Sequence, residues 1–590
     1  MTGNSPHEPA ESTRRNRSTA GTCDGPRKLS IALVNPRLPP GFHGFDFALP
    51  IIGNGVRAAM APPALPLLAA LVPAGHEVVL FDENIEEVAA ETLRPFDIVG
   101  ITGMLVQRPR MLGLLQELRD LPGLLAVGGP AVTADETPFE NHCDVRFIGE
   151  AERTWPEFIE CVAAGERSAG RYEQDGRTDM SSVPVPRYDL LRKGAYWRAA
   201  VQFSRGCPFL CEFCDIITQF GRRPRLKSPD QVLAEFEAVL DAGFSSCFLV
   251  DDNFIANKNQ AKALLKEIVR WQRERRYPLR LTTQASLNLA EDPELMELMA
   301  EANFSAVFIG IESPRQACLE EVRKNQNIHS IDMLERIRRV REHGLVVLGG
   351  FIVGFDHDDA GIFDEQFDFI ERSGIAQASI AILQPIPSTP LHARLRDAGR
   401  LSGAVRGVEF RPLRMSAEEL VHGYEGLIRR LYDPCVYFGR LYRGYCESEK
   451  FRQRQRAMGA TGRKRSLIGT LRGAVATATL LWRLIGHLRS KGRLKALGAA
   501  YLAIYWRQNR PLGRQALSLQ QFLSQCAQHW HFTRLFEQDQ IRFLSHDGPQ
   551  RAGSDRTVPE QEEPGMPMAF RAQPLAAAGR NAAPRAISET

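Results

Sequence analysis

The sequence predicts an α/β protein with two successive sheets of parallel strands and a helical C-terminal region. Residues 29–165 and 196–400 each alternate short apolar runs with helical patterns, which is typical of parallel sheets covered by helices. At 590 residues, the chain is far longer than one hydrophobic core usually supports, so we expect several domains. A composition of 44% hydrophobic and 24% charged residues excludes collagen, coiled-coil and wholly disordered proteins.

The first alternating stretch, residues 29–165, predicts a doubly wound domain. It follows a polar leader, residues 1–28, that lacks the apolar segment of a secretory signal and is expected to be disordered. Ligands of doubly wound sheets bind at the carboxyl ends of the strands, beside the point where the strand order reverses. The expected strands are residues 29–35, 77–82, 97–102, 124–127 and 145–148. The residues expected at the ligand-binding edge are Thr102, Gly103, Gly128 and Gly129.

The second alternating stretch, residues 196–400, predicts a partial barrel of six strand–helix units. A segment rich in Gly, Arg, Ser and Pro, residues 166–195, precedes it and is expected to be a linker. In barrels of parallel strands the chemistry lies on the loops at the carboxyl ends of the strands. The expected strands are residues 199–204, 246–250, 279–283, 306–310, 346–353 and 378–383. The helical patterns between them include residues 229–242, 259–275, 293–302 and 328–343.

Three cysteines follow the first strand of the predicted barrel at spacings of four and three: Cys207, Cys211 and Cys214. Three thiolates on one loop can hold a single iron–sulfur cluster, which binds soft sulfur ligands well. A structural zinc site normally has four protein ligands, and the sequence offers no fourth Cys or His at finger-like spacing nearby. Chance placement or a partial zinc knuckle is the alternative.

The cysteine content also indicates a cellular compartment. Eleven cysteines in the whole chain are too few for a disulfide scaffold, and their grouping favours metal ligation in a reducing environment. We therefore expect a cytoplasmic protein.

The motif Cys-x-x-x-Cys-x-aromatic-Cys, together with the six strand–helix units, resembles the radical S-adenosylmethionine (SAM) superfamily. The resemblance implies that the three cysteines bind a [4Fe–4S] cluster whose open iron chelates the amino and carboxylate groups of SAM. An injected electron then cleaves SAM to methionine and a 5′-deoxyadenosyl radical. The electron donor is expected to be a protein such as flavodoxin or ferredoxin.

The same resemblance implies positions for residues that bind SAM. Phe213 is expected beside the adenine, Asp252 and Asn253 where the amino group is held, and Gly310 and Glu312 where the ribose hydroxyls are held. A carboxylate at the end of a parallel strand suits these tasks because it accepts hydrogen bonds from an ammonium group or a diol. The alternatives are a loop-capping aspartate for Asp252 and a barrel-end ion pair for Glu312.

A doubly wound domain directly before such a barrel resembles the cobalamin-binding members of the superfamily. It implies cobalamin as a third cofactor, with Thr102, Gly103, Gly128 and Gly129 at its site. The motif Asp-x-His-x-x-Gly, which offers a lower histidine ligand to cobalt, does not follow the first strand, where Asn35-Pro36 stands instead. Many relatives also lack this motif, and a cobalt without a lower ligand suits a cobalt(I) nucleophile. A fold of this kind without a ligand is the alternative.

Motifs across residues 199–402 are similar to the subgroup that contains the hopanoid C-2 methylases and relatives with an extra helical C-terminal domain. These motifs are residues 207–215, 250–253, 283–286, 308–313, 350–356 and 383–390. The similarity implies a methyltransferase that acts on an unactivated carbon of a small-molecule or lipid substrate, hopanoid-like or a secondary metabolite. The alternatives are a cobalamin-dependent radical oxidation, cyclisation or rearrangement, and a non-catalytic iron–sulfur binding protein.

The C-terminal region, residues 401–545, is predicted to be helical and basic. Between Lys450 and Phe536 there are seventeen Lys or Arg and no Asp or Glu, so the remainder of the chain carries −13 against a total of +4. Such basic amphipathic helices attach to anionic membrane surfaces, and we expect peripheral contact at the inner membrane face. The residues that can form one apolar face are Leu471, Leu480, Leu481, Leu484, Ile485 and Leu488.

The basic region also allows interpretations other than membrane contact. A solvated helical face packed on the acidic remainder is the alternative to membrane contact. Nucleic acid is not an expected partner, because no recognised RNA-binding module accompanies the charge. The uncharged run at residues 473–482 is too short for a spanning helix. Residues 546–590 are expected to form a disordered tail.

Overall fold

A computed structural model describes residues 27–53, 55–166, 169–405, 407–446, 449, 452–453, 467–515 and 517–537. Residues 1–26 of the expected leader and the expected tail, residues 546–590, lie outside the described residues.

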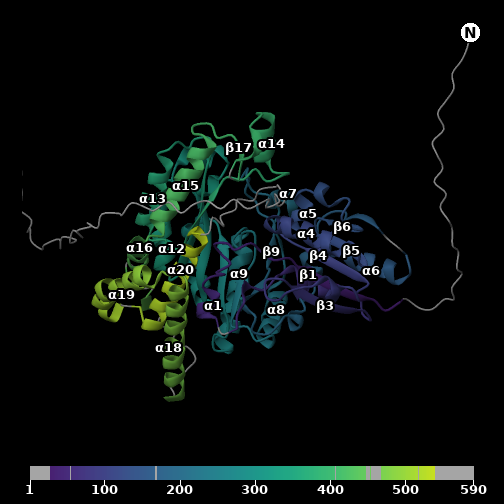
Figure 1. The fold of residues 1–590 in the computed structure, drawn as a ribbon, viewed down its shortest axis with the longest axis horizontal. Helices are drawn as coiled ribbons and strands as arrows, with labels where there is room; N and C mark the ends of the chain where they lie inside the picture. Colours follow the sequence, from purple (N-terminus) through teal and green to yellow (C-terminus); the bar gives the residue numbers. More distant parts are fainter. Residues whose placement is uncertain are drawn as a thin grey trace, which may run out of the picture. The chain divides into compact units, whose positions relative to one another are not determined.

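The first sheet is parallel and has six strands in the order β3-β1-β4-β5-β6-β7 (Figure 1). Five of these strands lie within one residue of the predicted positions. The strand order reverses between β1 and β4, which places the ligand-binding edge at their carboxyl ends. The strands are β1 (Ser30–Asn35), β3 (Glu77–Asp82), β4 (Ile98–Thr102), β5 (Leu124–Gly128), β6 (Val145–Ile148) and β7 (Gly170–Glu173).

Helices cover both faces of the first sheet, as the doubly wound prediction requires. On one face α4 (Arg108–Leu118) and α5 (Pro130–Ala134) pack on the sheet through a hydrophobic core that contains Val99 and Met111. On the other face α2 (Ala64–Ala70) and α6 (Thr154–Ala163) pack through a second core. Alternate residues of each strand contribute to opposite cores because side chains of a strand point to alternate faces.

The edge strand β7 lies within the stretch that was expected to be a linker. It pairs with β6 in parallel register, with Val145 opposite Gly170 and Ile148 opposite Glu173. An edge strand buries little surface, so its residues Gly-Arg-Tyr-Glu lack the apolar run by which the other strands were recognised.

The second sheet is a curled parallel half-barrel with the order β15-β14-β13-β12-β11-β8-β2. Six of its seven strands were predicted from the sequence, and helices alternate with them, which confirms the partial barrel. These six strands are β8 (Tyr196–Val201), β11 (Ser246–Leu249), β12 (Arg280–Ala285), β13 (Phe304–Glu312), β14 (Val346–Val353) and β15 (Ala378–Ile382). The helices include α8 (Pro229–Asp241), α9 (Lys258–Glu274), α10 (Pro293–Glu301), α12 (Met333–Glu342) and α13 (Ile362–Ser373).

The seventh strand, β2 (Ala58–Met60), comes from the segment that follows β1 rather than from the barrel sequence. It pairs with β8, with Ala58 opposite Tyr196 and Met60 opposite Arg198. A strand of only three residues, Ala-Ala-Met, close to two prolines gives no periodic signal, so sequence patterns could not show it.

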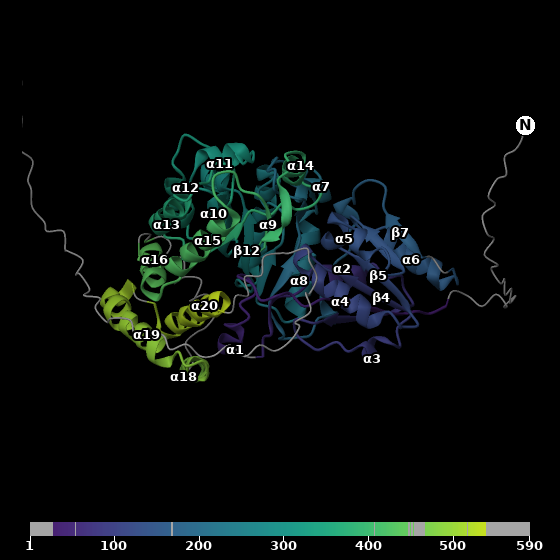
Figure 2. The same ribbon diagram turned by 45° about the horizontal axis from the view of Figure 1, so that its top comes forward.

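The C-terminal region is helical, as predicted, and its helices pack on each other and on α1 (Leu49–Ile52) (Figure 2). They are α15 (Ala417–Leu431), α16 (Pro434–Cys446), α18 (Leu467–Ser490), α19 (Ala499–Ile504) and α20 (Leu519–Glu537). A two-stranded sheet of β16 (Leu401–Val405) and β17 (Val408–Phe410) precedes them. Of the helices in the described part of the chain, none is long and apolar enough to cross a membrane.

The predicted apolar face of the basic region divides into two parts. Leu480, Leu484 and Leu488, one turn apart on α18, are buried. Leu481 and Ile485 were expected on the same face but are about 40% exposed. The side chain of Leu471 lies outside the described residues.

Two glycines of α15 offer a matched test of the packing between α13 and α15. We expect Gly423→Ala to destabilise the protein by about 1–3 kcal/mol, because the new methyl group would collide with the Phe363 ring. Gly426 has open space where a β-carbon would lie, so Gly426→Ala should instead stabilise the helix by about 0.5–1 kcal/mol. Urea unfolding of the two variants measures both effects, and equal shifts would contradict this packing.

Candidate cluster and cofactor site

The three cysteines lie on one loop, residues 202–214, that follows β8 and that we call the cysteine loop. Gly206 has a φ of +96°, and a β-carbon there would lie 2.9 Å from the carbonyl oxygen of Gly221. Only glycine adopts this turn without strain. The next backbone N–H, that of Cys207, donates a hydrogen bond to the same carbonyl at 3.2 Å. The turn therefore fixes the position from which the first thiol projects.

The thiols sit in an enclosed environment. Cys211 is buried, and Cys207 and Cys214 are partly buried. Burial raises the pKa of Cys207 and raises that of Cys214 to about 12. The Cys211 thiol adds to both shifts through its charge, so the three groups lie close enough to interact electrostatically. Three nearby soft donors fit an iron–sulfur cluster, which binds thiolates.

A single metal ion fits this loop less well than a cluster does. Within the described ranges, no three Cys, His, Asp or Glu side chains are placed to hold one metal ion. Each cysteine of a cluster binds a different iron atom, so cluster ligands need not converge on one point. In addition, Gln326 Nε2 donates a hydrogen bond to Cys211 Sγ at 3.4 Å, and hydrogen bonds to sulfur tune the potential of such clusters.

Three polar residues after β11 hold the cysteine loop in place. Asp251 Oδ1 accepts hydrogen bonds from the backbone N–H groups of Phe203 and Ser204 at 2.7 and 3.0 Å. Asp252 Oδ2 accepts one from the N–H of Gly206 at 2.7 Å. Burial raises the pKa of Asp251 to about 7 and that of Asp252 to about 6. One oxygen of Asp252 thus caps the loop, which is the alternative considered for it, and its contact with SAM stays a prediction.

Asn253 links the cysteine loop to the next strand. Its Nδ2 donates a hydrogen bond to Ser286 Oγ at 3.0 Å, after β12. It also acts to lower the pKa of the Cys207 thiol. The residue predicted to lie near the SAM amino group therefore interacts with a predicted cluster ligand.

The residues predicted for the adenine and the ribose meet around one lysine. Lys324 Nζ donates a hydrogen bond to Glu312 Oε1 at 2.7 Å and lies 5.8 Å from the centre of the Phe213 ring. Gly310 leaves the space that the Glu312 carboxylate occupies, since a β-carbon at Gly310 would lie 3.0 Å from Lys324 Nζ and collide with that carboxylate. Glu312 itself has a φ of +67°, which is uncommon for a residue with a side chain.

Sequence reasoning did not find Lys324. Burial acts to lower its pKa, but Glu312 and the thiols of Cys211 and Cys214 outweigh burial and raise it. The lysine is therefore charged and faces both the predicted cluster ligands and the predicted ribose carboxylate. A single lysine in the polar stretch Arg-Lys-Asn-Gln carries no spacing signal that sets it apart from a surface residue.

The four residues predicted to bind cobalamin also lie together, at the ends of β4 and β5. Gly129 has a φ of +91°, and a β-carbon there would lie 2.6 Å from Thr102 Oγ1 and 2.9 Å from the Gly103 carbonyl oxygen. The N–H of Gly103 donates to the carbonyl of Gly128 at 3.4 Å. Two loops thus pack closely at these glycines, beside the point where the strand order reverses and where ligands of such sheets bind. Their contact with cobalamin stays a prediction.

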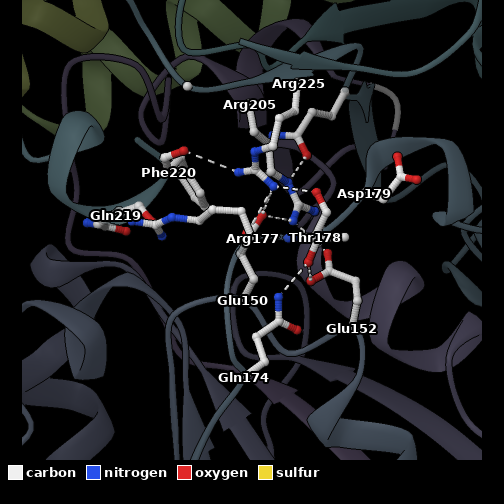
Figure 3. A network of polar contacts seen from close by, with 12 residues as sticks. Glu150, Glu152, Gln174, Arg177, Thr178, Asp179, Arg205, Gln219, Phe220 and Arg225 are labelled. Carbon is white, nitrogen blue, oxygen red and sulfur yellow. Dashed lines mark hydrogen bonds and ion pairs between the residues drawn. The ribbon is translucent and has the colours of Figure 1, made fainter. Parts of the chain in front are cut away.

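A buried ionic network joins the first sheet to the cysteine loop (Figure 3). Glu150, which follows β6, lies 2.7 Å from Arg205 Nη1 and 2.9 Å from Arg225 Nη1. Glu152 lies 2.6 Å from the same atom of Arg205. The Glu150 side chain is 2% exposed and that of Arg205 8% exposed. Arg205 stands two positions before Cys207, so this network positions the first predicted cluster ligand against the first sheet.

Comparisons with known proteins agree with this geometry. Residues 201–370 match the radical SAM superfamily, and residues 389–542 match a domain of unknown function, DUF4070. The chain is 39% identical to the "Uncharacterized methyltransferase sll1242" of Synechocystis sp., over 70% of this chain and 78% of that protein. It is 32% identical to the hopanoid C-2 methylase of Rhodopseudomonas palustris, over 78% of this chain and 87% of that protein.

The chain belongs to the radical SAM superfamily. Within it, the chain is a member of the family of the hopanoid C-2 methylase. Membership confirms the expected enzyme class and, with it, the [4Fe–4S] cluster and SAM as cofactors. The three thiols, the Lys324–Glu312 pair and Phe213 form the part of the described structure that fits these two groups.

Solved structures show the same fold. TsrM, a radical SAM methyltransferase from Kitasatospora setae with cobalamin and a [4Fe–4S] cluster bound, is 18% identical and covers 74% of this chain and 99% of its own, with a TM-score of 0.53. OxsB, a cobalamin-dependent radical SAM enzyme, is 15% identical and covers 87% of this chain and 84% of its own, with a TM-score of 0.52. The arrangement of a doubly wound domain before a radical SAM barrel is therefore confirmed at the level of fold.

The buried network can be tested by removing its central carboxylate. We expect Glu150→Ala to lower the free energy of unfolding by about 3–5 kcal/mol, because Arg225 and, in part, Arg205 would lose their buried counter-charge. Glu173 forms a comparable pair with Arg171, but the two side chains are 54% and 43% exposed, so Glu173→Ala should cost less than about 1 kcal/mol. Urea denaturation compares the two variants, and similar losses would show that the network is not buried in solution.

Proposed function

We propose that the protein is a cobalamin-dependent radical SAM methyltransferase that acts on an unactivated carbon of a lipid or a secondary metabolite. The observation that carries the proposal is the similarity to the hopanoid C-2 methylase over 87% of that protein's length. The similarity extends beyond the radical SAM match at residues 201–370, so it includes more than the barrel. A methylase of a polycyclic lipid is therefore the nearest characterised chemistry among these relatives.

Each cofactor has residues that would hold it. The three cysteines would hold the cluster, and Phe213 and Glu312 would lie beside the adenine and ribose of SAM. The glycines at the ends of β4 and β5 would hold cobalamin. The cluster supplies the electron that cleaves SAM, and cobalamin carries the methyl group. TsrM and OxsB, whose structures contain cobalamin, support this third cofactor through their shared fold.

The protein's own residues would orient the cofactors and exclude water from them. Asp251 and Asp252 fix the backbone at the start of the cysteine loop. Lys324 places a positive charge between the thiols and Glu312, which offsets the negative charge of a thiolate-bound cluster. The Glu150 network holds the first sheet against this loop. We expect the two predicted cofactor sites to face each other across this contact, which would protect reactive species from water.

The cluster ligands can be tested with a matched cysteine. We expect Cys207→Ala, Cys211→Ala and Cys214→Ala to abolish iron binding and the release of 5′-deoxyadenosine after anaerobic reconstitution with SAM and dithionite. Cys435 is exposed at the start of α16, so Cys435→Ala should keep normal iron content and activity. Iron analysis and chromatography measure both quantities, and a coloured, iron-containing Cys211→Ala protein would contradict the assignment.

Product mass separates methylation from other radical chemistry. With SAM carrying a deuterated methyl group, the proposed reaction adds that labelled group to the product, whereas oxidation, cyclisation or rearrangement adds none. A lipid extract and a polar extract of cells that contain the protein serve as substrate sources. The proposed electron donor, flavodoxin or ferredoxin, should replace dithionite in this assay.

The exposed side of α18 supports a proposed contact with an anionic membrane surface. Val475, Trp482 and Ile485 lie on one face at 100° per residue and are 60%, 76% and 41% exposed. This face is opposite the buried Leu480, Leu484 and Leu488. The exposed cationic residues Arg489, Lys491 and Lys495 follow in the same region. Tryptophan with nearby cationic side chains is typical of helices that lie in a membrane interface.

Vesicle binding tests this contact. We expect Trp482→Ser to weaken binding to phosphatidylglycerol vesicles roughly tenfold, because the most exposed aromatic side chain of the face is lost. Leu413→Ser, which removes an apolar side chain that is 60% exposed before α15, is the control and should bind like the unmodified protein. Sedimentation with vesicles gives the affinities. Equal affinity for phosphatidylcholine vesicles, or no effect of Trp482→Ser, would rule out this surface.

A further inference from the structure

An arginine in the second sheet lacks an acidic partner. Arg198 lies on β8, and within the described residues no carboxylate is within ion-pair distance of its guanidinium. The guanidinium instead lies 4.9 Å from the centre of the Trp197 ring. Burial lowers the pKa of Arg198, and the one group that opposes this shift is the thiol of Cys247. The Arg198 side chain is partly buried, and an enclosed cation without a counter-charge favours the binding of an anion.

The strand register places Arg198 on the inner face of the half-barrel. Its neighbour Ala199 is opposite Cys247 on β11, and both are fully buried. Both belong to the buried core that also contains Phe236 of α8, so this pair faces the helices. Successive side chains of a strand alternate between faces, and Arg198 therefore points to the other side.

The same inner face carries a series of apolar side chains. Phe248 on β11 is opposite Ala200, two positions after Arg198, and therefore shares its face. Gln284 on β12 is opposite Phe308 on β13, and Phe308 is opposite Leu348 on β14. Phe248, Phe308 and Leu348 are only partly buried, whereas their neighbours Leu249, Ile309 and Val347 are buried. The inner face thus keeps apolar surface that no protein atoms cover.

A histidine from another part of the chain faces this surface. His43, in the segment between β1 and α1, packs edge-on against Phe308 with ring centres 5.5 Å apart. Burial, together with the charge of Arg198, lowers the pKa of His43 to about 4. Its side chain is nevertheless exposed. His43 therefore lies against the uncovered apolar surface of the inner face, while part of its own side chain stays accessible.

We infer that Arg198 and His43 bind an anionic group of the substrate, a carboxylate or a phosphate, while Phe248, Phe308 and Leu348 contact its apolar body. This inference rests on the proposed function, because it assigns the uncovered surface of the inner face to the substrate of that reaction. A guanidinium pairs with two oxygens of such a group in a fixed geometry. His43 is neutral at physiological pH and can donate one hydrogen bond without adding a second buried charge. The substrate thus carries an anionic group on an apolar body.

Three probes with the same alkyl chain test the inference: decanoate, decyl phosphate and 1-decanol. Calorimetric titration of the reconstituted holoenzyme should show at least tenfold tighter binding of decanoate or decyl phosphate than of 1-decanol. Arg198→Gln should remove this preference, Arg198→Lys should keep part of it, and His43→Phe should reduce it severalfold. Arg119→Gln, at a side chain that is 77% exposed in the first sheet's domain, is the control and should change nothing.

The outcomes separate this inference from the proposed function. Equal affinities for the three probes, no binding of any probe, or a preference that survives in a folded Arg198→Gln protein would overturn the inference. If Arg198→Gln does not fold, as judged by circular dichroism and iron content, the probe affinities of His43→Phe and of the unmodified protein decide between the outcomes. Release of 5′-deoxyadenosine is measured in parallel. Selective binding of the acids without this release would refute the radical chemistry and leave the anion site standing.

Discussion

The buried contact between Glu150 and two arginines is the constraint on which the rest of the site depends. Glu150 follows β6 of the first sheet, whereas Arg205 and Arg225 lie opposite each other on two short antiparallel strands, β9 (Ser204–Arg205) and β10 (Arg225–Leu226), between which the cysteines lie. Burial of three charges is unfavourable unless every partner is present. The network is therefore satisfied only when both sheets are folded and correctly placed, which couples the order of the cysteine loop to the fold of the domain before it.

Electrostatic balance follows the same logic at the predicted cluster. Burial raises the pKa of Cys207 and that of Cys214. Lys324 supplies one compensating cation, held in place by Glu312 rather than by solvent. Burial also raises the pKa values of Asp251 and Asp252, and their carboxylate oxygens accept hydrogen bonds from backbone N–H groups of the cysteine loop. The site thus combines fixed dipoles with one anchored positive charge, which would offset the negative charge of a thiolate-bound cluster.

Much of this arrangement was predictable from the sequence, and the reasons for the failures are physical. Strands buried on both faces, such as β4 and β14, are continuous apolar runs and were found within one residue. The cysteine spacing is local, so it needed no tertiary information. In contrast, β2 and β7 are short edge strands with little buried surface, and Lys324 gains its role only from residues distant in sequence. Arg198 and His43 are 155 positions apart in the printed sequence and meet only through the fold.

The strand β2 has a consequence for how the protein can be divided. Its backbone covers the edge of β8, whose ladder groups would otherwise face solvent and invite pairing with another chain. The segment that supplies it runs between strands of the first sheet, so no single cut in the sequence yields both sheets complete. A truncated barrel that starts at β8 would expose unpaired backbone N–H and C=O groups along this edge, which favours association with other chains. The two halves are therefore an interlocked unit that evolution can vary at its surface but cannot readily exchange as separate modules.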